Sequence, residues 1–239
     1  MSRRRSRLLG AARGKFGYLL LALFALLLSA PVMAEGWAWR VLILVFVAGV
    51  LVAGLYAVRP GRHSLIAGLV VAAVEFAIGR LAVAYPAHWL ILAQIVLWMV
   101  ALLYVTVAIL DWVLDSPEVT LETLQAAFCV YLLLGLLWVY LYALMEVTSP
   151  VSFRVLRGPA SVWTDERSRR LEFTRLFIFS YATLTGTGRG DLEPATGFAD
   201  MAAALEAMSA HVYLAVVIAR LVGLQASAPP PGAPRGSVR

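Results

Sequence analysis

Apolar residues occur along this chain in long unbroken runs, and short polar segments separate one run from the next. A helix needs about 20 predominantly apolar residues to cross the roughly 30 Å hydrocarbon core of a bilayer. Six runs are of that order, and they lie at residues 16–33, 39–58, 64–84, 89–113, 121–146 and 200–224. The pattern predicts an all-α membrane protein with six transmembrane helices.

A further apolar run, at residues 171–184, is too short to cross a bilayer and lies between the last two predicted spans. A glycine-rich stretch follows it directly. Non-helical backbone is tolerated at membrane depth where it is buried in protein or lines a water-filled cavity. We therefore expect a re-entrant pore helix and loop between helices five and six.

Basic residues give the expected orientation in the membrane. Six of them precede residue 16, and the loop 59–63 contains two arginines, so the positive-inside rule places the N-terminus in the cytoplasm. Six crossings then return the C-terminus to the cytoplasm, whereas the arginine-rich segment 147–170 comes out external, against the rule. The first run has a second interpretation, because residues 31–34 resemble the cleavage site of a signal peptide covering 1–34. Both interpretations give the same orientation.

Composition limits the classes of function. With 62% hydrophobic and only 14% charged residues, the chain is unlike a soluble globular protein. The single cysteine, Cys129, excludes an intrachain disulfide, and the three histidines His63, His88 and His211 show no serine–histidine or zinc-ligand spacing. The net charge of +6 is not interleaved with aromatic residues as in nucleic-acid-binding patches. We expect no enzyme activity, no nucleic-acid partner and no cofactor or metal beyond a permeant ion.

The chain divides into four expected parts. These are a basic cytoplasmic N-terminus (1–15), a four-helix peripheral membrane block (16–113), a pore domain (114–224) and a disordered cytoplasmic tail (225–239). The fourth span, 89–113, contains no Lys or Arg, although voltage sensors need repeated arginines. Ser116 before Pro117 has the pattern of a helix N-cap with proline at the first helical position. We expect weak or absent voltage dependence, and a fifth helix that begins near Pro117.

The pore region resembles a known family in two places. Residues 177–185 are similar to the end of the pore helix in bacterial channels, and the residues that follow resemble the GxGDxxP signature, at Gly188, Gly190, Asp191 and Pro194. The chain thus resembles a bacterial potassium-channel-like family, which has a two-helix pore preceded by extra N-terminal transmembrane helices. The resemblance implies a homotetramer in lipid of the bacterial inner membrane, in which rings of backbone carbonyls bind the ion. The filter residues implied are Thr185, Gly186, Thr187, Gly188, Arg189 and Gly190.

This filter departs from the family pattern at two critical positions, and Thr187 replaces the usual valine as a milder change. Gly186 stands where the family has the threonine that supplies the innermost coordinating hydroxyl, and Arg189 stands where it has a tyrosine. Four arginine charges at the mouth would each repel a monovalent cation at about 6 Å by about 3 kcal/mol at an effective dielectric constant near 20. Conduction therefore requires that Arg189 be neutralised. Asp191, Glu193 and Glu206 are the candidate partners, and pairing with Asp191 or Glu206 is preferred to an arginine exposed at the rim.

Other polar residues in the predicted spans leave alternatives open. Glu206 can instead form an internal hydrogen bond to the pore helix, and Glu75 can pair with Arg80 inside the bundle or line a proton route. His211 is a possible cavity or gate residue, or a histidine satisfied by helix packing.

The expected function is that of a passive channel subunit for monovalent cations, potassium-channel-like, voltage-insensitive and with altered selectivity. The alternative is a non-conducting or regulatory homologue, in which the Arg189 ring blocks the pore or the subunit works only with a heteromeric channel partner. Anion passage is the third and less favoured possibility.

Overall fold

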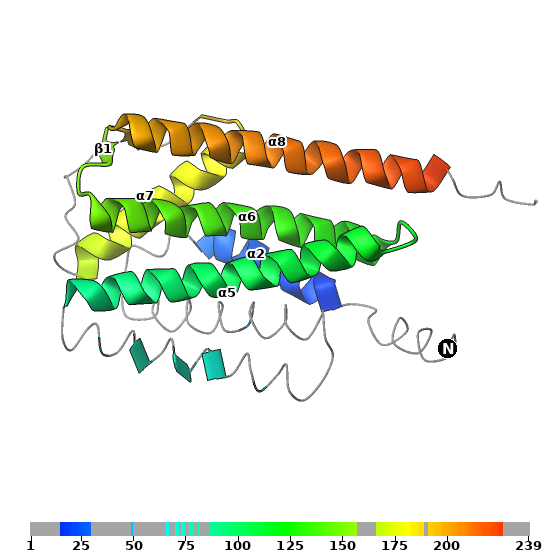
Figure 1. Cartoon of the computed structure of the whole chain (residues 1–239), viewed down its shortest axis with the longest axis horizontal. Helices are drawn as coiled ribbons and strands as arrows, with labels where there is room; N and C mark the ends of the chain where they lie inside the picture. The colour runs from blue at the N-terminus through cyan, green and yellow to red at the C-terminus, as the bar shows by residue number, and fades with distance from the viewer. Residues whose placement is uncertain are drawn as a thin grey trace, which may run out of the picture.

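The computed structural model describes residues 15–29, 87–156, 166–188 and 191–226, together with scattered helical positions between 49 and 81. The described part is mostly helical (Figure 1). Its helices are α2 (Lys15–Ser29), α5 (His88–Asp115), α6 (Leu121–Thr148), α7 (Glu166–Leu184) and α8 (Gly197–Ala226). Two short strands, β1 (Phe153–Val155) and β2 (Leu192–Pro194), complete it.

Three of these helices, α5, α6 and α8, are long and apolar enough to span a membrane. They confirm a helical membrane-type fold, and they coincide with the predicted spans 89–113, 121–146 and 200–224 to within a few residues. The described part thus holds three candidate spans where the sequence predicts six. Helix α2 has only 15 residues, too few to cross, and the runs 39–58 and 64–84 fall almost entirely outside the described residues.

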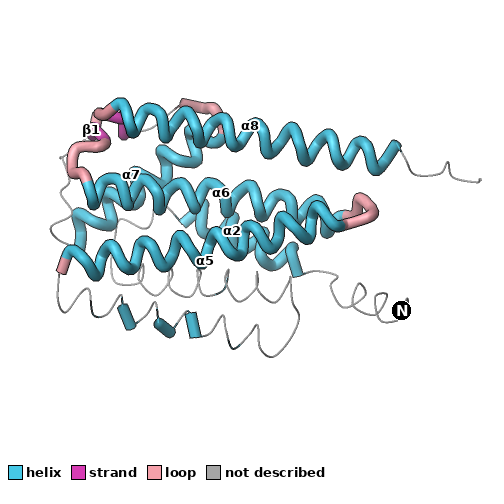
Figure 2. Tube along the Cα trace, viewed as in Figure 1, coloured by secondary structure: helices cyan, strands magenta, loops and turns pink. Residues whose placement is uncertain are grey.

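Helix α6 is the centre of the arrangement, because it contacts α2, α5, α7 and α8. Helices α5, α6 and α8 run side by side, and α7 crosses obliquely beside α6 in the half of the bundle that also holds β1 (Figure 1). The turn between α5 and α6 lies at the opposite end (Figure 2). This placement explains why α6 is apolar all round, since neighbours cover most of its surface.

The start of α6 corrects one expectation. Ser116 is the C-cap of α5, because its N–H donates to Val113 O at 3.4 Å and its hydroxyl donates to Trp112 O at 2.8 Å. The N-cap of α6 is Thr120, whose Oγ1 accepts from Thr123 N at 3.2 Å in a reciprocal capping box. The hydroxyl of Ser116 was therefore assigned to the wrong helix, and α6 begins at Leu121 rather than near Pro117.

Helix α8 buries a narrow stripe against α6 and α7. The buried residues are mostly small and lie three, four or seven positions apart, as one face of a helix requires, at Ala199, Ala202, Glu206, Ala210 and Val217. Small side chains let helix backbones approach closely in membrane proteins. Most of the rest of the surface of α8 is exposed in the single chain.

The two strands tie the segments before and after α7 together. They are antiparallel, and Arg154 lies opposite Glu193 in the register. Residues that follow α6 are thereby fixed beside the residues that lead into α8.

Candidate pore loop and its supporting contacts

The loop after α7 folds back onto the end of that helix. Thr185 N donates to Tyr181 O at 3.1 Å and Gly186 N to Thr183 O at 3.1 Å. The N–H groups of Thr187 and Gly188 both donate to Ala182 O, at 2.9 Å and 3.3 Å. All four N–H groups from 185 to 188 are thus bonded to the last turn of α7.

The carbonyl oxygens of the same four residues, 185–188, are left available. Among the described residues, none donates a hydrogen bond to any of them. Residues 185–188 are exposed in the single chain, so these carbonyls are open to the surroundings of the loop. The bonds of Thr187 N to Ala182 O and of Gly186 N to Thr183 O, with Gly186 at a positive φ, are those of a Schellman C-cap at the end of α7.

Two glycines allow this backbone conformation. Gly186 has φ of 70° and Gly188 has φ of 60°, both in the left-handed region that disfavours residues with a Cβ atom. The backbone conformation at position 186 therefore favours glycine. The sequence alone indicated only that a threonine hydroxyl is missing there. The hydroxyl of Thr187 finds an acceptor, since it donates to Ala182 O at 3.3 Å.

Helix α6 holds α7 behind the loop through three hydrogen bonds to backbone carbonyls. Tyr131 Oη donates to Leu184 O at 3.0 Å and Tyr181 Oη donates to Leu132 O at 2.7 Å. Ser180 Oγ lies 2.9 Å from Gly135 O, within donating distance. The helices approach most closely at Gly135, where an added Cβ would lie 2.8 Å from Tyr181 Cε1.

Glu206 joins α8 to the same assembly. Its side chain is 0% exposed. Tyr142 Oη lies 2.5 Å from Oε2, and Ser180 Oγ lies 2.6 Å from Oε1. The sequence raised this internal bond to the pore helix as the alternative to pairing with Arg189, and in the structure both carboxyl oxygens are engaged by hydroxyl groups.

The structure describes only some of the remaining predicted site residues. Arg189 and Gly190 lie outside the described residues, so the predicted pairing of Arg189 stays a prediction. Asp191 and Glu193 are both exposed, and the carbonyl of Asp191 accepts from Leu156 N at 2.8 Å. His211 is exposed on α8, with Nδ1 2.6 Å from Ala207 O of its own helix. Glu75 and Arg80 also fall outside the described residues.

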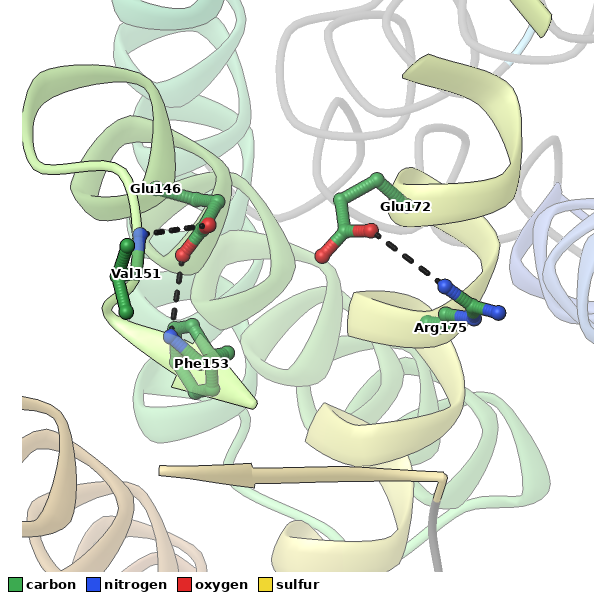
Figure 3. A network of polar contacts seen from close by, with 5 residues as sticks. All are labelled: Glu146, Val151, Phe153, Glu172 and Arg175. Atoms are coloured by element: carbon green, nitrogen blue, oxygen red, sulfur yellow. Dashed lines mark hydrogen bonds and ion pairs between the residues drawn. The ribbon is translucent and has the colours of Figure 1, made fainter. Parts of the chain in front are cut away.

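Two further carboxyl groups lie where α6 ends, and the sequence reading overlooked them (Figure 3). Glu146 accepts from Val151 N at 3.2 Å and from Phe153 N at 3.1 Å, and so holds a turn in which Val151 has φ of 88°. Glu172 of α7 is 2% exposed and forms an ion pair with Arg175 at 3.8 Å. Burial, and then the negative charge of Glu146, raise the pKa of Glu172 to about 7, although Arg175 opposes the shift.

The other overlooked residues are Gly135, Tyr142 and Ser180. Ser180 and Glu206 are polar residues inside otherwise apolar helical runs, and that interruption was a signal that could have linked them. Gly135 and Tyr142 carried no comparable signal, because a glycine and a tyrosine are ordinary in a membrane helix.

Comparisons with known proteins add no relative to this picture. No protein-family model matches the chain, and no curated protein or solved structure matches it. Among the described residues, no group of three or more His, Cys, Asp or Glu side chains is placed to hold a metal ion.

Proposed function

We propose that this protein is a subunit of a tetrameric, potassium-channel-like pore that conducts monovalent cations passively. In this account α6 is the outer helix, α7 the re-entrant pore helix, residues 185–190 the filter and α8 the inner helix. The membrane is the bacterial inner membrane, and both termini are cytoplasmic. The four-helix block 16–113 surrounds the pore without a charged voltage sensor.

The observation that carries the proposal is the polarity of the loop backbone. The N–H groups of residues 185–188 are all bonded to the end of α7, and their carbonyls accept no hydrogen bond from the described part of the chain. One such loop offers too few oxygens to replace the hydration shell of a cation, whereas four loops around an axis offer rings of them. The proposal of a tetramer follows from this requirement.

The exposed face of α8 supports the same assembly. Eight apolar residues on it alternate in spacing between three and four positions, and all eight are exposed in the single chain: Phe198, Met201, Leu205, Met208, Val212, Ala215, Ala219 and Val222. This spacing is typical of a seam between two packed helices. Copies of α8 that pack along this seam would enclose a central pathway, with the loops after α7 at one end.

Selectivity follows from the loop residues. Gly186 provides no hydroxyl group at the inner site, so discrimination between potassium and sodium is expected to be weaker than in a filter with threonine there. Four Arg189 side chains close a cation pathway unless carboxylates neutralise them, and the exposed Asp191 and Glu193 are on the same segment. Glu206 is engaged with Tyr142 and Ser180, which favours Asp191 as the partner.

Flux through liposomes tests the proposal. Purified protein is reconstituted, and potassium, sodium and chloride flux are compared for the wild type, Arg189→Tyr and Arg189→Gln. Threonine is not introduced at 186, because the backbone there has φ of 70°. The proposal predicts cation flux in the wild type that exceeds the flux of protein-free liposomes.

The other outcomes identify the competing functions. Cation flux only in Arg189→Tyr or Arg189→Gln would indicate a blocked, regulatory subunit. Chloride flux without cation flux would indicate an anion pathway, and no flux in any variant would refute conduction by this chain alone.

A further inference from the structure

A single carboxyl group on α8 lies where three helices meet. Glu206 is fully buried, with Tyr142 Oη of α6 at 2.5 Å from Oε2 and Ser180 Oγ of α7 at 2.6 Å from Oε1. Ser180 Oγ is also 2.9 Å from Gly135 O of α6. These four residues form one chain of polar contacts across α6, α7 and α8.

The number of protons available to these polar contacts identifies the protonation state of the Glu206 carboxyl group. A serine hydroxyl has one proton to donate, a carbonyl oxygen only accepts, and an ionised carboxylate only accepts. With an ionised Glu206, the single proton of Ser180 would have to serve both Gly135 O and Oε1. A protonated carboxyl group supplies the second proton, and every contact in the chain then has a donor and an acceptor.

The surroundings of the group agree with this count. Titratable side chains near Glu206 are the phenols of Tyr131 and Tyr142 from α6 and of Tyr181 from α7, which are neutral at ordinary pH. Within the described ranges, no Lys, Arg or His side chain forms an ion pair with it. An ionised carboxylate buried without a cation is costly, and it stays buried only when paired.

We propose that Glu206 is a neutral carboxylic acid in the folded protein and acts as a positioning residue for the pore loop. Its proton is donated to Ser180 Oγ, the Ser180 proton to Gly135 O, and the Tyr142 proton to Glu206 Oε2. Ser180 lies one helical turn before Leu184, the last residue of α7, so the chain fixes the part of α7 on which residues 185–188 fold back. The positioning role rests on the proposed function of the loop, whereas the protonation state does not.

Infrared difference spectroscopy tests the protonation state in reconstituted protein at neutral pH. Wild type minus Glu206→Gln should show the C=O band of a protonated carboxyl group, shifted on transfer to D2O. Glu118→Gln is the matched control, because Glu118 is exposed and its loss should remove carboxylate bands only. Loss of carboxylate bands in Glu206→Gln, as in the control, would overturn the proposal.

Wild-type protein labelled with 13C at glutamate carboxyl groups gives the same answer if Glu206→Gln does not fold. A protonated band that shifts with the label, and moves again in Ser180→Ala, is the expected result. Absence of a protonated glutamate band that moves in Ser180→Ala would overturn the proposal, because Glu172, whose pKa is raised to about 7, gives a protonated band of its own. Neither measurement needs ion flux, so a failure of the proposed function would be seen separately.

Amide hydrogen exchange of residues 185–188 tests the positioning role. Ser180→Ala removes both hydrogen bonds of the Ser180 hydroxyl, to Glu206 and to Gly135 O, which predicts exchange faster by roughly fivefold or more. Glu206→Gln keeps a donor and an acceptor and should leave exchange near the wild-type rate. Thr148→Ala, which loses only bonds within its own helix, is the control. Unchanged exchange in Ser180→Ala would contradict the role.

Discussion

Replacing Gly135 by alanine adds a methyl group where α6 and α7 come closest. The new Cβ would lie 2.8 Å from Tyr181 Cε1, 3.0 Å from Tyr181 Cζ and 3.1 Å from Leu184 Cδ2. The ring of Tyr181 has little freedom to withdraw, because its hydroxyl donates to Leu132 O at 2.7 Å and its centroid is 4.8 Å from that of Phe177. The helices must therefore separate, or the ring must leave its hydrogen bond.

Two terms of opposite sign decide the size of the effect. Overpacking of a tight interior site typically costs about 1–3 kcal/mol. Alanine in place of glycine inside a helix contributes about 0.8–1.0 kcal/mol of stability. The net expectation for Gly135→Ala is a loss of about 1 kcal/mol in the free energy of unfolding, with the two terms partly cancelling.

A matched glycine separates the two terms. Gly223 is also helical, in the last turns of α8, and an added Cβ there meets nothing within 4 Å. Gly223→Ala should therefore show the helix-propensity gain alone, and the difference between the two variants isolates the packing cost at about 1–3 kcal/mol. Thermal or denaturant unfolding in one detergent, followed by circular dichroism, measures both.

A double-mutant cycle adds a second check on Gly135. In a Tyr181→Ala background most of the clash is gone, so Gly135→Ala should lose most of its cost. Equal effects of Gly135→Ala and Gly223→Ala, or a cost that persists without the tyrosine ring, would refute the close packing of α6 on α7.

Three further predictions concern the loop and the two ends of the bundle. Gly186→Ala should destabilise the protein by about 1 kcal/mol, because alanine is strained at the positive φ of this position. An added Cβ meets no other atom within 4 Å, so the backbone conformation alone accounts for the cost. Equal unfolding midpoints for the variant and the wild type would contradict this. The pKa of Glu172 is raised from 4.5 to about 7, so the folded state binds the proton of this carboxyl group more tightly than the unfolded state does. The free energy of unfolding should therefore fall as the pH rises from about 4.5 to about 7. Glu172→Gln should remove the corresponding fall in melting temperature between pH 5 and pH 8. Arg220 of α8 donates to Leu114 O and, at 2.8 Å, to Ser116 O at the end of α5. Arg220→Met should therefore lower the free energy of unfolding by about 1.5–3 kcal/mol and speed amide exchange in residues 112–118. Unchanged exchange in these residues would exclude the contact.

The length of the apolar runs was sufficient to predict the long helices of the described part. The positions of α5, α6 and α8, to within a few residues, follow from unbroken apolar runs, because backbone groups in lipid must be satisfied within the helix. The error at Ser116 has a local cause, since a serine before a proline is compatible with either the end of one helix or the start of the next. Only the reciprocal bonds of Thr120 and Thr123 decide between them.

The supporting contacts of the loop were less predictable, because they join residues distant in sequence. Glu206 was recognised as a candidate partner of Arg189, but its bonds reach Ser180 and Tyr142, which are 26 and 64 residues away. Gly186 was interpreted as the loss of a hydroxyl group, whereas its positive φ depends on how the loop folds back onto α7. Pairwise geometry of this kind is not contained in hydrophobic pattern or composition.

The central claim is that carbonyls of residues 185–188 from four copies surround a cation. A high-resolution structure of the assembled protein in potassium, determined by electron cryo-microscopy in lipid, is the most direct test. The account predicts four-fold symmetry, with the α8 seam residues between neighbouring copies and potassium density on the axis beside these carbonyls. A single chain or a dimer without such an axis, or carbonyls of 185–188 turned into the protein, would contradict it.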